Sequence, residues 1–238
     1  MSYAIFDIET RINKQLLADT LYRGEISAEE AYERHCAELR EQYGSDFVSV
    51  PFHVPISIAV ASVGADHRLL SAEALPAESE QGLVRAFWQR AEGFRGCLVS
   101  FNGRGFDLPV LELQALRHGV AMPKYFAAKY GPRYRFQTDA HLDLLEFLSN
   151  NGAARMRGGL DVLLRLCGYA GKGDLRGGDV QVLYEAGRVD EIHAYCLRDV
   201  VSTYCLFLRV QVMRGLLDLP RAEELAAQAS EQFEGGNP

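Results

Sequence analysis

Short apolar segments typical of β-strands come early in this 238-residue chain, and amphipathic helical segments follow them. This order limits the possible folds more strongly than any other feature. Strands are expected over residues 3–8, 55–63, 68–74, 96–101 and 134–138. Helices are expected over residues 79–94, 107–118, 141–150, 159–167, 178–186, 189–214 and 221–233. Strands at the start, followed by strand–helix units, predict an α/β fold in which helices flank a mixed sheet.

The stretch between the first two strands, residues 11–49, has a different character and is predicted to be a helical insert. Ser27, with Glu30 three residues later, has the pattern of a capping box at a helix start. We expect residues 1–238 to form a single domain that carries this insert, with residues 234–238 frayed at its end.

Composition excludes several classes of protein. Apolar residues make up 48% of the chain, which is too many for a fully disordered protein. Apolar stretches such as Ile56–Val63 are too short to span a membrane, so no membrane association is expected. No secretory signal is visible, and the five cysteines form no close CxxC pair. Reduced thiols and a cytoplasmic location are therefore expected.

Charge is distributed unevenly along the chain. The net charge of −7 argues against a protein that passively coats nucleic acid, although an enzyme that meets phosphates through metal ions can be acidic. Residues 124–176 differ from the whole, with nine Lys or Arg against five Asp or Glu. This segment is the expected phosphate-facing surface.

The first candidate for chemistry is the sequence Asp7-Ile-Glu9 at the end of the first strand. Residues two apart on a strand project to the same side, so both carboxylates point together. Close carboxylates repel each other unless a cation lies between them. The alternative is that Asp7 simply ends the strand and Glu9 faces solvent.

The second candidate is the segment from Ser100 to Pro109, in which a strand leads through a glycine-containing loop into a helix. Asp107, at the helix start, is either a metal ligand at the carboxyl end of a strand or a helix N-cap. Asn102 is either a turn residue or a substrate contact. Phe106 is either a core residue or a surface on which a base stacks.

The third candidate is Tyr195-Cys-Leu-Arg-Asp199 within a strongly helical segment. A spacing of four residues puts the phenol and the carboxylate on one helix face, one turn apart. The alternative is a structural Tyr–Asp pair beside a core face.

Together, these three motifs resemble those of the DEDD superfamily of 3′–5′ exonucleases in order, spacing and placement. More closely, the chain resembles the predicted bacterial 3′–5′ exonucleases related to the exonuclease domain of family B DNA polymerases. The resemblance covers nearly the whole chain and includes four further segments. These are Val50-Pro-Phe-His-Val-Pro55, Thr138-Asp-Ala-His-Leu-Asp-Leu144, Gly171-Lys-Gly-Asp174 and Leu183-Tyr-Glu-Ala-Gly-Arg188.

The resemblance implies a ribonuclease-H-like fold and hydrolysis of the 3′-terminal phosphodiester of single-stranded DNA, with RNA as a further possible substrate. It implies that Asp7 bridges two divalent cations while Glu9, Asp107 and Asp199 complete their ligands. Oxygen ligands favour Mg²⁺ or Mn²⁺. Tyr195 is then expected to orient the attacking water, since a phenol with a pKa near 10 is a poor base at neutral pH.

The branch of the superfamily that uses tyrosine fits better than the branch that uses histidine. The histidine branch carries its histidine five residues before the last Asp, where this chain has Ala194. His193 is one residue out of register and receives no catalytic role. Asn102, Phe106 and Thr10 are the expected substrate contacts.

Weaker predictions concern residues outside the motifs. Asp143 is expected either to orient the metal ligands without binding the metal itself or to be a helix N-terminal residue. Four basic residues are expected either to bind the nucleic-acid backbone or to form a solvent-exposed surface. They are Arg155, Arg157, Lys172 and Arg176. Alternative functions are a non-catalytic adaptor with this fold and an oligoribonuclease-like enzyme that acts on very short substrates.

Overall fold

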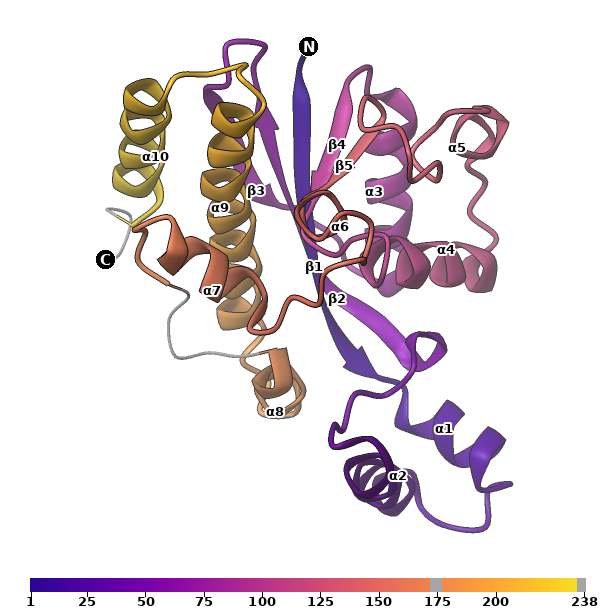
Figure 1. The fold of residues 1–238 in the computed structure, drawn as a ribbon. Coiled ribbons are helices and arrows are strands. Elements are labelled where there is room, and N and C mark those ends of the chain that lie inside the picture. Colours follow the sequence, from indigo (N-terminus) through magenta and orange to yellow (C-terminus); the bar gives the residue numbers. More distant parts are fainter. Residues whose placement is uncertain (172–176, 235–238) are drawn as a thin grey trace.

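The computed structural model describes residues 1–171 and 177–234, and it contains a five-stranded mixed sheet (Figure 1). The strands are β1 (Tyr3–Ile12), β2 (His53–Val63), β3 (Leu69–Ala74), β4 (Cys97–Ser100) and β5 (His141–Asp143). Their spatial order is β3-β2-β1-β4-β5. β1, β2 and β3 pair antiparallel, whereas β4 and β5 extend the sheet in parallel from β1. The predicted α/β fold with a mixed sheet is confirmed.

Helices cover both faces of this sheet. The helices described are α1 (Lys14–Leu21), α2 (Ala28–Tyr43), α3 (Glu80–Gly93), α4 (Asp107–His118), α5 (Pro123–Ala127), α6 (Leu144–Leu148), α7 (Gly159–Leu166), α8 (Val180–Glu185), α9 (Val189–Met213) and α10 (Leu219–Glu234). Short 3₁₀ turns, η1 (Val50–Phe52) and η2 (Gly177–Asp179), precede β2 and α8. Figure 1 shows α9 and α10 on one side of β1, with α3 and α4 on the other.

The alternation of β1 supplies both cores. Tyr3 and Ile5 pack into the cluster formed with α9 and α10, whereas Phe6 and Ile8 pack into the cluster formed with α3 and α4. A strand buried on both faces is expected at the centre of a sheet that has helical layers on each side. The side of β1 that carries Tyr3 and Ile5 is also the side on which Asp7 and Glu9 follow.

The predicted insert contains α1 and α2, which pack around their own small core at the lower right of Figure 1. Ser27 Oγ accepts a hydrogen bond from the backbone N–H of Glu30 at 3.2 Å, so α2 begins at the predicted cap. β1 continues to Ile12, two residues into the range predicted as helical insert.

The region after α5 was predicted wrongly in two respects. Residues 134–138 form turns rather than a strand, and the strand of this region is β5 at 141–143. The alternation of aromatic and basic residues mimics a strand, but Tyr134 and Phe136 are both exposed and bury no face. The helix predicted from residue 141 begins only at Leu144, because Asp143 ends β5 and caps α6.

No helix among residues 1–171 and 177–234 combines the length and apolar character needed to cross a bilayer. All five cysteines are free thiols in the structure. Glu234 ends α10, and the rest of the predicted frayed tail, residues 235–238, lies outside the described residues.

Candidate active site

Asp7 and Glu9 follow the buried apolar residues of β1 on the side that faces α9. Glu9 is only 8% exposed and Asp7 is partly exposed. Glu9 is paired with Ser57 across β1 and β2, and the register shifts directly after it. The alternative in which Glu9 faces solvent is therefore wrong.

α9 brings the third motif to the same place. One carboxylate oxygen each from Asp7, Glu9 and Asp199 lies within 4.8 Å of the other two, a group that can hold a metal ion. Asp199 is buried at the side of α9 that packs on the sheet. Three carboxylates this close repel one another, and a bound cation would relieve that repulsion. We call this group, with Asp107 and Tyr195, the carboxylate pocket.

Asp107 lies beside β1 but is not one of the three residues whose carboxylate oxygens converge within 4.8 Å. It is the first residue of α4, and the N-cap position belongs to Phe106, so the helix-cap alternative is wrong. Its Oδ1 instead accepts a hydrogen bond from the backbone N–H of Ile8 at 3.2 Å. β4 pairs with β1 only as far as Ile5, which leaves room beside Ile8 for this side chain. Asp107 thus lies against the residue between Asp7 and Glu9.

Tyr195 lies one helical turn before Asp199 and is also buried. Its ring packs with Val180 and Leu183 of α8 and with Ile56, the residue of β2 left out of register by the shift after Glu9. Burial raises the pKa of Tyr195 above its ordinary value of 10, and the nearby charges of Asp199 and Glu9 raise it further. The phenol therefore stays protonated and donates hydrogen bonds.

Cys196 is a pocket residue that the sequence analysis did not single out. Its thiol is fully buried and lies 3.4 Å from the main-chain oxygen of Asp7 and 3.8 Å from Asp7 Oδ2. Burial raises the pKa of this thiol well above its ordinary value of 9, and the charges of Asp7 and Glu9 raise it further. The sequence contains no signal for this role, because a single cysteine within a helical motif is equally typical of the core.

The loop from Asn102 to Asp107 is fixed by Asp143. Asp143 accepts hydrogen bonds from the backbone N–H groups of Asn102 at 3.1 Å and Arg104 at 2.9 Å. It also accepts from Leu145 and Glu146, and so caps α6. Asp143 therefore has the predicted helix-capping role and in addition holds the loop that carries Asn102. The Asn102 backbone adopts a left-handed conformation, with φ of 65°.

Two predicted substrate contacts, Thr10 and Phe106, both touch His53. The sequence analysis assigned no role to this histidine. Thr10 Oγ1 lies 2.7 Å from His53 Nδ1, and the Phe106 ring meets the His53 ring edge-on at 4.9 Å. Burial lowers the pKa of His53, so the ring is neutral. His53 Nε2 must then donate to the Val48 carbonyl at 2.9 Å, and Nδ1 accepts from the Thr10 hydroxyl. The exposed Phe47 stacks on His53 from another side.

Three further residues considered in the sequence, His193, Arg155 and Arg157, are not part of the group of three carboxylates. His193 Nδ1 lies 2.9 Å from Ser57 Oγ, so this ring contacts β2. Arg155 and Arg157 are exposed in an irregular segment before α7. Lys172 and Arg176 lie outside the described residues.

Comparisons with known proteins identify the family and the fold to which this chain is similar. Residues 45–236 match the family described as "Predicted 3'-5' exonuclease related to the exonuclease domain of PolB", a match that begins after Asp7 and Glu9. The fold is similar to that of a family B DNA polymerase from the hyperthermophilic archaeon Pyrobaculum calidifontis, with a TM-score of 0.54 and 15% identity. That match covers 89% of this chain and 24% of the polymerase, so the chain spans about a quarter of the polymerase's length. A search of curated proteins gave no match.

The family match covers most of the chain, and the fold match covers nearly all of it. The sheet and its flanking helices have the ribonuclease-H-like arrangement of the polymerase exonuclease domain. The chain therefore belongs to the family of predicted 3′–5′ exonucleases related to the exonuclease domain of PolB.

Proposed function

We propose that this protein removes nucleotides from the 3′ end of single-stranded DNA with the help of two divalent cations, Mg²⁺ or Mn²⁺. The observation that carries the proposal is the convergence of Asp7, Glu9 and Asp199 to within 4.8 Å. Asp199 of α9 lies at least 190 positions from Asp7 and Glu9 of the first strand, yet the three carboxylates meet at one place. The family match supports the reaction class.

The donor set suits hard divalent cations. Asp7, Glu9, Asp107 and Asp199 offer carboxylate oxygens, which Mg²⁺ and Mn²⁺ prefer over nitrogen or sulfur ligands. Bound there, such ions would activate a water and neutralise charge on the phosphate oxygens. The carboxylates of β1 and α9 would fix the positions of the ions, because both elements are anchored in the hydrophobic core.

Tyr195 would act as a hydrogen-bond donor beside the reacting phosphate. A phenol, whose ordinary pKa is near 10, is a poor base at neutral pH. The hydrogen bond of Tyr195 with Asp199 fixes the phenol at the edge of the carboxylate pocket. From that position the O–H can orient a water or a phosphate oxygen.

The 3′-terminal nucleotide would contact the residues around His53. Phe106 offers a partly exposed ring next to Asp107, and the His53 ring holds it edge-on. Asn102 is exposed on the same motif loop. Thr10 follows Glu9 on β1, and its hydroxyl is engaged by His53. We therefore assign base stacking to Phe106 and polar contacts with the terminal nucleotide to Asn102 and Thr10.

Oligonucleotides labelled at either end test the proposal. With Mg²⁺ or Mn²⁺, a 5′-labelled single strand should give a ladder of progressively shorter products, and a 3′-labelled strand should release labelled mononucleotide first. The Asp7→Asn variant should lose this activity. Glu78→Gln, which removes a charge from an exposed side chain, is the matched control and should keep it. Cleavage by Asp7→Asn at the wild-type rate, or none by wild type, would contradict the proposal and favour an adaptor.

A further inference from the structure

The segment between α5 and β5 exposes aromatic side chains that a protein of this size would be expected to bury. Four large rings of residues 126–136, which we call the aromatic segment, are between 40% and 70% exposed. They are Phe126, Tyr130, Tyr134 and Phe136. Tyr125, directly before them, is buried against Trp88, so the chain is anchored in the core immediately before the exposed rings begin.

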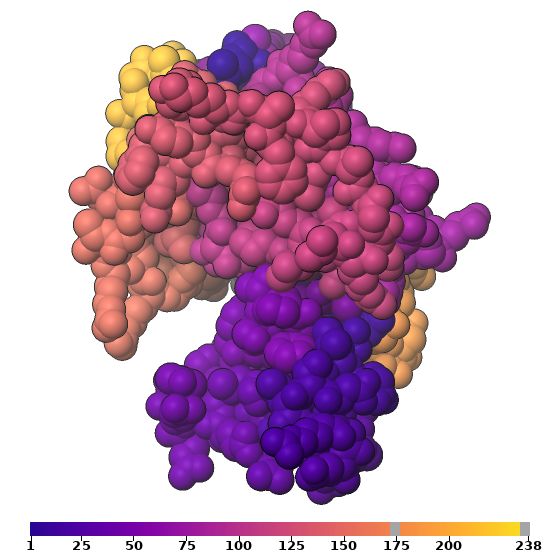
Figure 2. All heavy atoms as spheres, turned by 90° about the vertical axis from the view of Figure 1, so that its right-hand side faces the viewer, coloured from indigo at the N-terminus to yellow at the C-terminus, as the bar shows by residue number. Residues whose placement is uncertain are grey.

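These rings are arranged as a series rather than scattered. Tyr130 and Tyr134 meet edge-to-face at 5.1 Å, and Tyr134 and Phe136 at 6.0 Å. The backbone of the segment is folded by turns, with Tyr134 N–H donating to Gly131 O at 2.9 Å. Neighbouring rings therefore support one another while each keeps exposed surface. Figure 2 views the molecule from the right-hand side of Figure 1, and the pink atoms of this region lie across the upper part of the surface shown.

Positive charge accompanies the rings. Residues 123–137 contain four Lys or Arg and no Asp or Glu, in a chain whose net charge is −7. Lys129 lies over the Tyr130 ring at 5.3 Å, Arg133 over Phe126 at 5.1 Å, and Arg135 over Phe136 at 5.9 Å. Arg133 and Arg135 also pair with Glu112 and Glu146, but both arginine side chains remain about half exposed. Aromatic rings interleaved with cations are what a single-stranded nucleic acid requires, because bases stack and phosphates need counter-charge.

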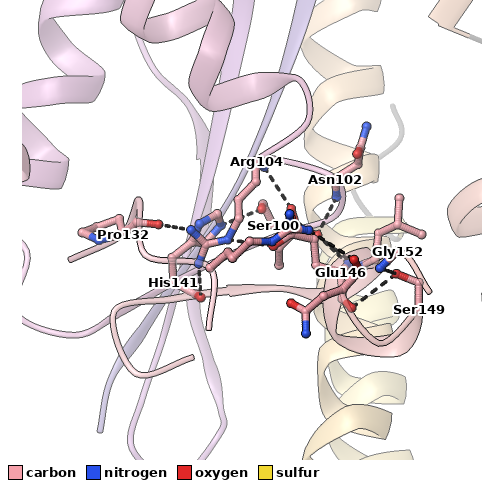
Figure 3. Close-up of polar contacts among 12 residues, drawn as sticks. Ser100, Asn102, Arg104, Pro132, His141, Glu146, Ser149 and Gly152 are labelled. Atoms are coloured by element: carbon pink, nitrogen blue, oxygen red, sulfur yellow. Dashed lines mark hydrogen bonds and ion pairs between the residues drawn. The ribbon is translucent and has the colours of Figure 1, made fainter. Parts of the chain in front are cut away.

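The aromatic segment is joined to the carboxylate pocket through Arg104. This residue lies in the motif loop, and its side chain donates to the carbonyl oxygens of Pro132 and of His141, the latter at 2.8 Å (Figure 3). Its guanidinium also pairs with Glu146 at 3.0 Å, and Glu146 in turn pairs with Arg135. The loop that positions Asp107 therefore also holds the aromatic segment.

We infer that the aromatic segment is a second nucleic-acid contact, which binds nucleotides of the single strand upstream of its 3′ end. This inference rests on the proposed function. It adds the substrate class: the protein prefers strands long enough to reach both the carboxylate pocket and the aromatic segment. Very short oligonucleotides contact only the pocket.

Binding and hydrolysis measured side by side test the inference. Affinity for a 5′-fluorescein oligothymidylate of about 20 nucleotides is measured by anisotropy in EDTA, so that binding is separated from cleavage. The triple variant Tyr130→Ala/Tyr134→Ala/Phe136→Ala should bind this strand about tenfold more weakly or worse, because each stacked base contributes substantially. Its ratio of kcat/KM for the long strand over a trinucleotide should fall to a similar extent.

Two control variants separate stacking from other effects. Tyr130→Phe/Tyr134→Phe keeps the rings and should bind the long strand like wild type. Leu70→Ala removes an exposed apolar side chain from β3 and should change neither measurement. Lys129→Gln should lower the slope of log affinity against log salt by about 0.7, the value for one phosphate contact on a single strand.

The outcomes distinguish the two proposals. If the triple variant binds the long strand as tightly as wild type, or if wild type does not bind it, the aromatic segment is not a nucleic-acid contact. If wild type binds through the rings but hydrolyses neither substrate, the exonuclease proposal fails and the contact stands. Circular dichroism with an unchanged thermal midpoint shows that the triple variant is folded.

Discussion

The carboxylate pocket and the aromatic segment are built in opposite ways. The pocket carboxylates Glu9, Asp107 and Asp199 are each at most 8% exposed and lie on β1, α4 and α9, whose apolar faces form the core. The aromatic segment has no helix or strand beyond α5 and leaves its rings half exposed. The difference fits the two proposed roles, because catalytic groups must be held on rigid elements, whereas contacts with a flexible strand tolerate adaptable loops.

The largest expected effect is on the chemistry of the pocket. Asp199→Asn removes one charge from the group of three and should lower kcat by about a thousandfold, since a metal ligand supplies several kcal/mol to the reaction. The thermal midpoint in EDTA should stay the same or rise, because repulsion among the remaining carboxylates is weaker. Steady-state kinetics and calorimetry measure the two quantities. A clear fall in the EDTA midpoint would mean that Asp199 holds the fold rather than the metal.

A substitution at the junction of the two regions should affect both. Arg104→Ala leaves the carbonyls of Pro132 and His141 without this donor and should lower the free energy of unfolding by about 3 kcal/mol. Affinity for a long single strand should also fall, while Mn²⁺ binding to the pocket should change less. Urea unfolding and anisotropy measure these effects. Equal losses of metal and strand binding would mean that the two regions are not separable.

The same junction predicts a pH dependence of stability. His141 is fully buried with Nε2 2.8 Å from Ser100 Oγ, and burial, aided by the nearby Arg104 charge, lowers its pKa from 6.5 to about 3. The folded ring stays neutral while the unfolded chain takes up a proton below pH 6.5, so this contribution is complete above pH 6.5 and is lost as the pH falls towards 3.

Wild type should therefore lose about 2 kcal/mol of unfolding free energy between pH 6.5 and pH 5 through this residue. His141→Gln should show a correspondingly flatter pH profile, whatever its stability at neutral pH. Urea titrations across this range measure both profiles. Parallel profiles for the two proteins would show that His141 does not carry the dependence.

The smallest expected effect concerns Tyr195. Tyr195→Phe keeps the ring that packs with Val180 and Leu183 but removes the hydroxyl, and kcat should fall about tenfold, as for one hydrogen bond to a charged group. KM for a long strand should hardly change, because the aromatic segment is untouched. A change in KM with kcat unaltered would place the phenol in ground-state binding instead.

Much of the pocket was predictable because its signals are local. The two-residue spacing of Asp7 and Glu9 and the four-residue spacing of Tyr195 and Asp199 each fix a shared face. Their approach to one another depends on how α9 packs on β1, which no local pattern encodes and which the family resemblance supplied. The structure excludes the two structural alternatives: Glu9 is buried rather than facing solvent, and the N-cap position of α4 belongs to Phe106 rather than Asp107.

The part that escaped prediction depends on tertiary contacts. β5 has only three residues, too few for an alternating pattern, and it exists because it pairs with β4. Tyr134 and Phe136 alternate like a strand, but both side chains are exposed. The sequence does not decide between the two roles of Asp143, because two of its four hydrogen bonds to backbone N–H groups reach a loop about 40 residues away.

Manganese titration followed by electron paramagnetic resonance tests the central claim most directly, because it counts bound ions without requiring turnover. We expect wild type to bind two Mn²⁺ ions, and Asp7→Asn to bind them at least about tenfold more weakly, since the bridging carboxylate is lost. Glu78→Gln should bind like wild type. No binding by wild type at millimolar Mn²⁺, or equal binding by Asp7→Asn, would contradict the account.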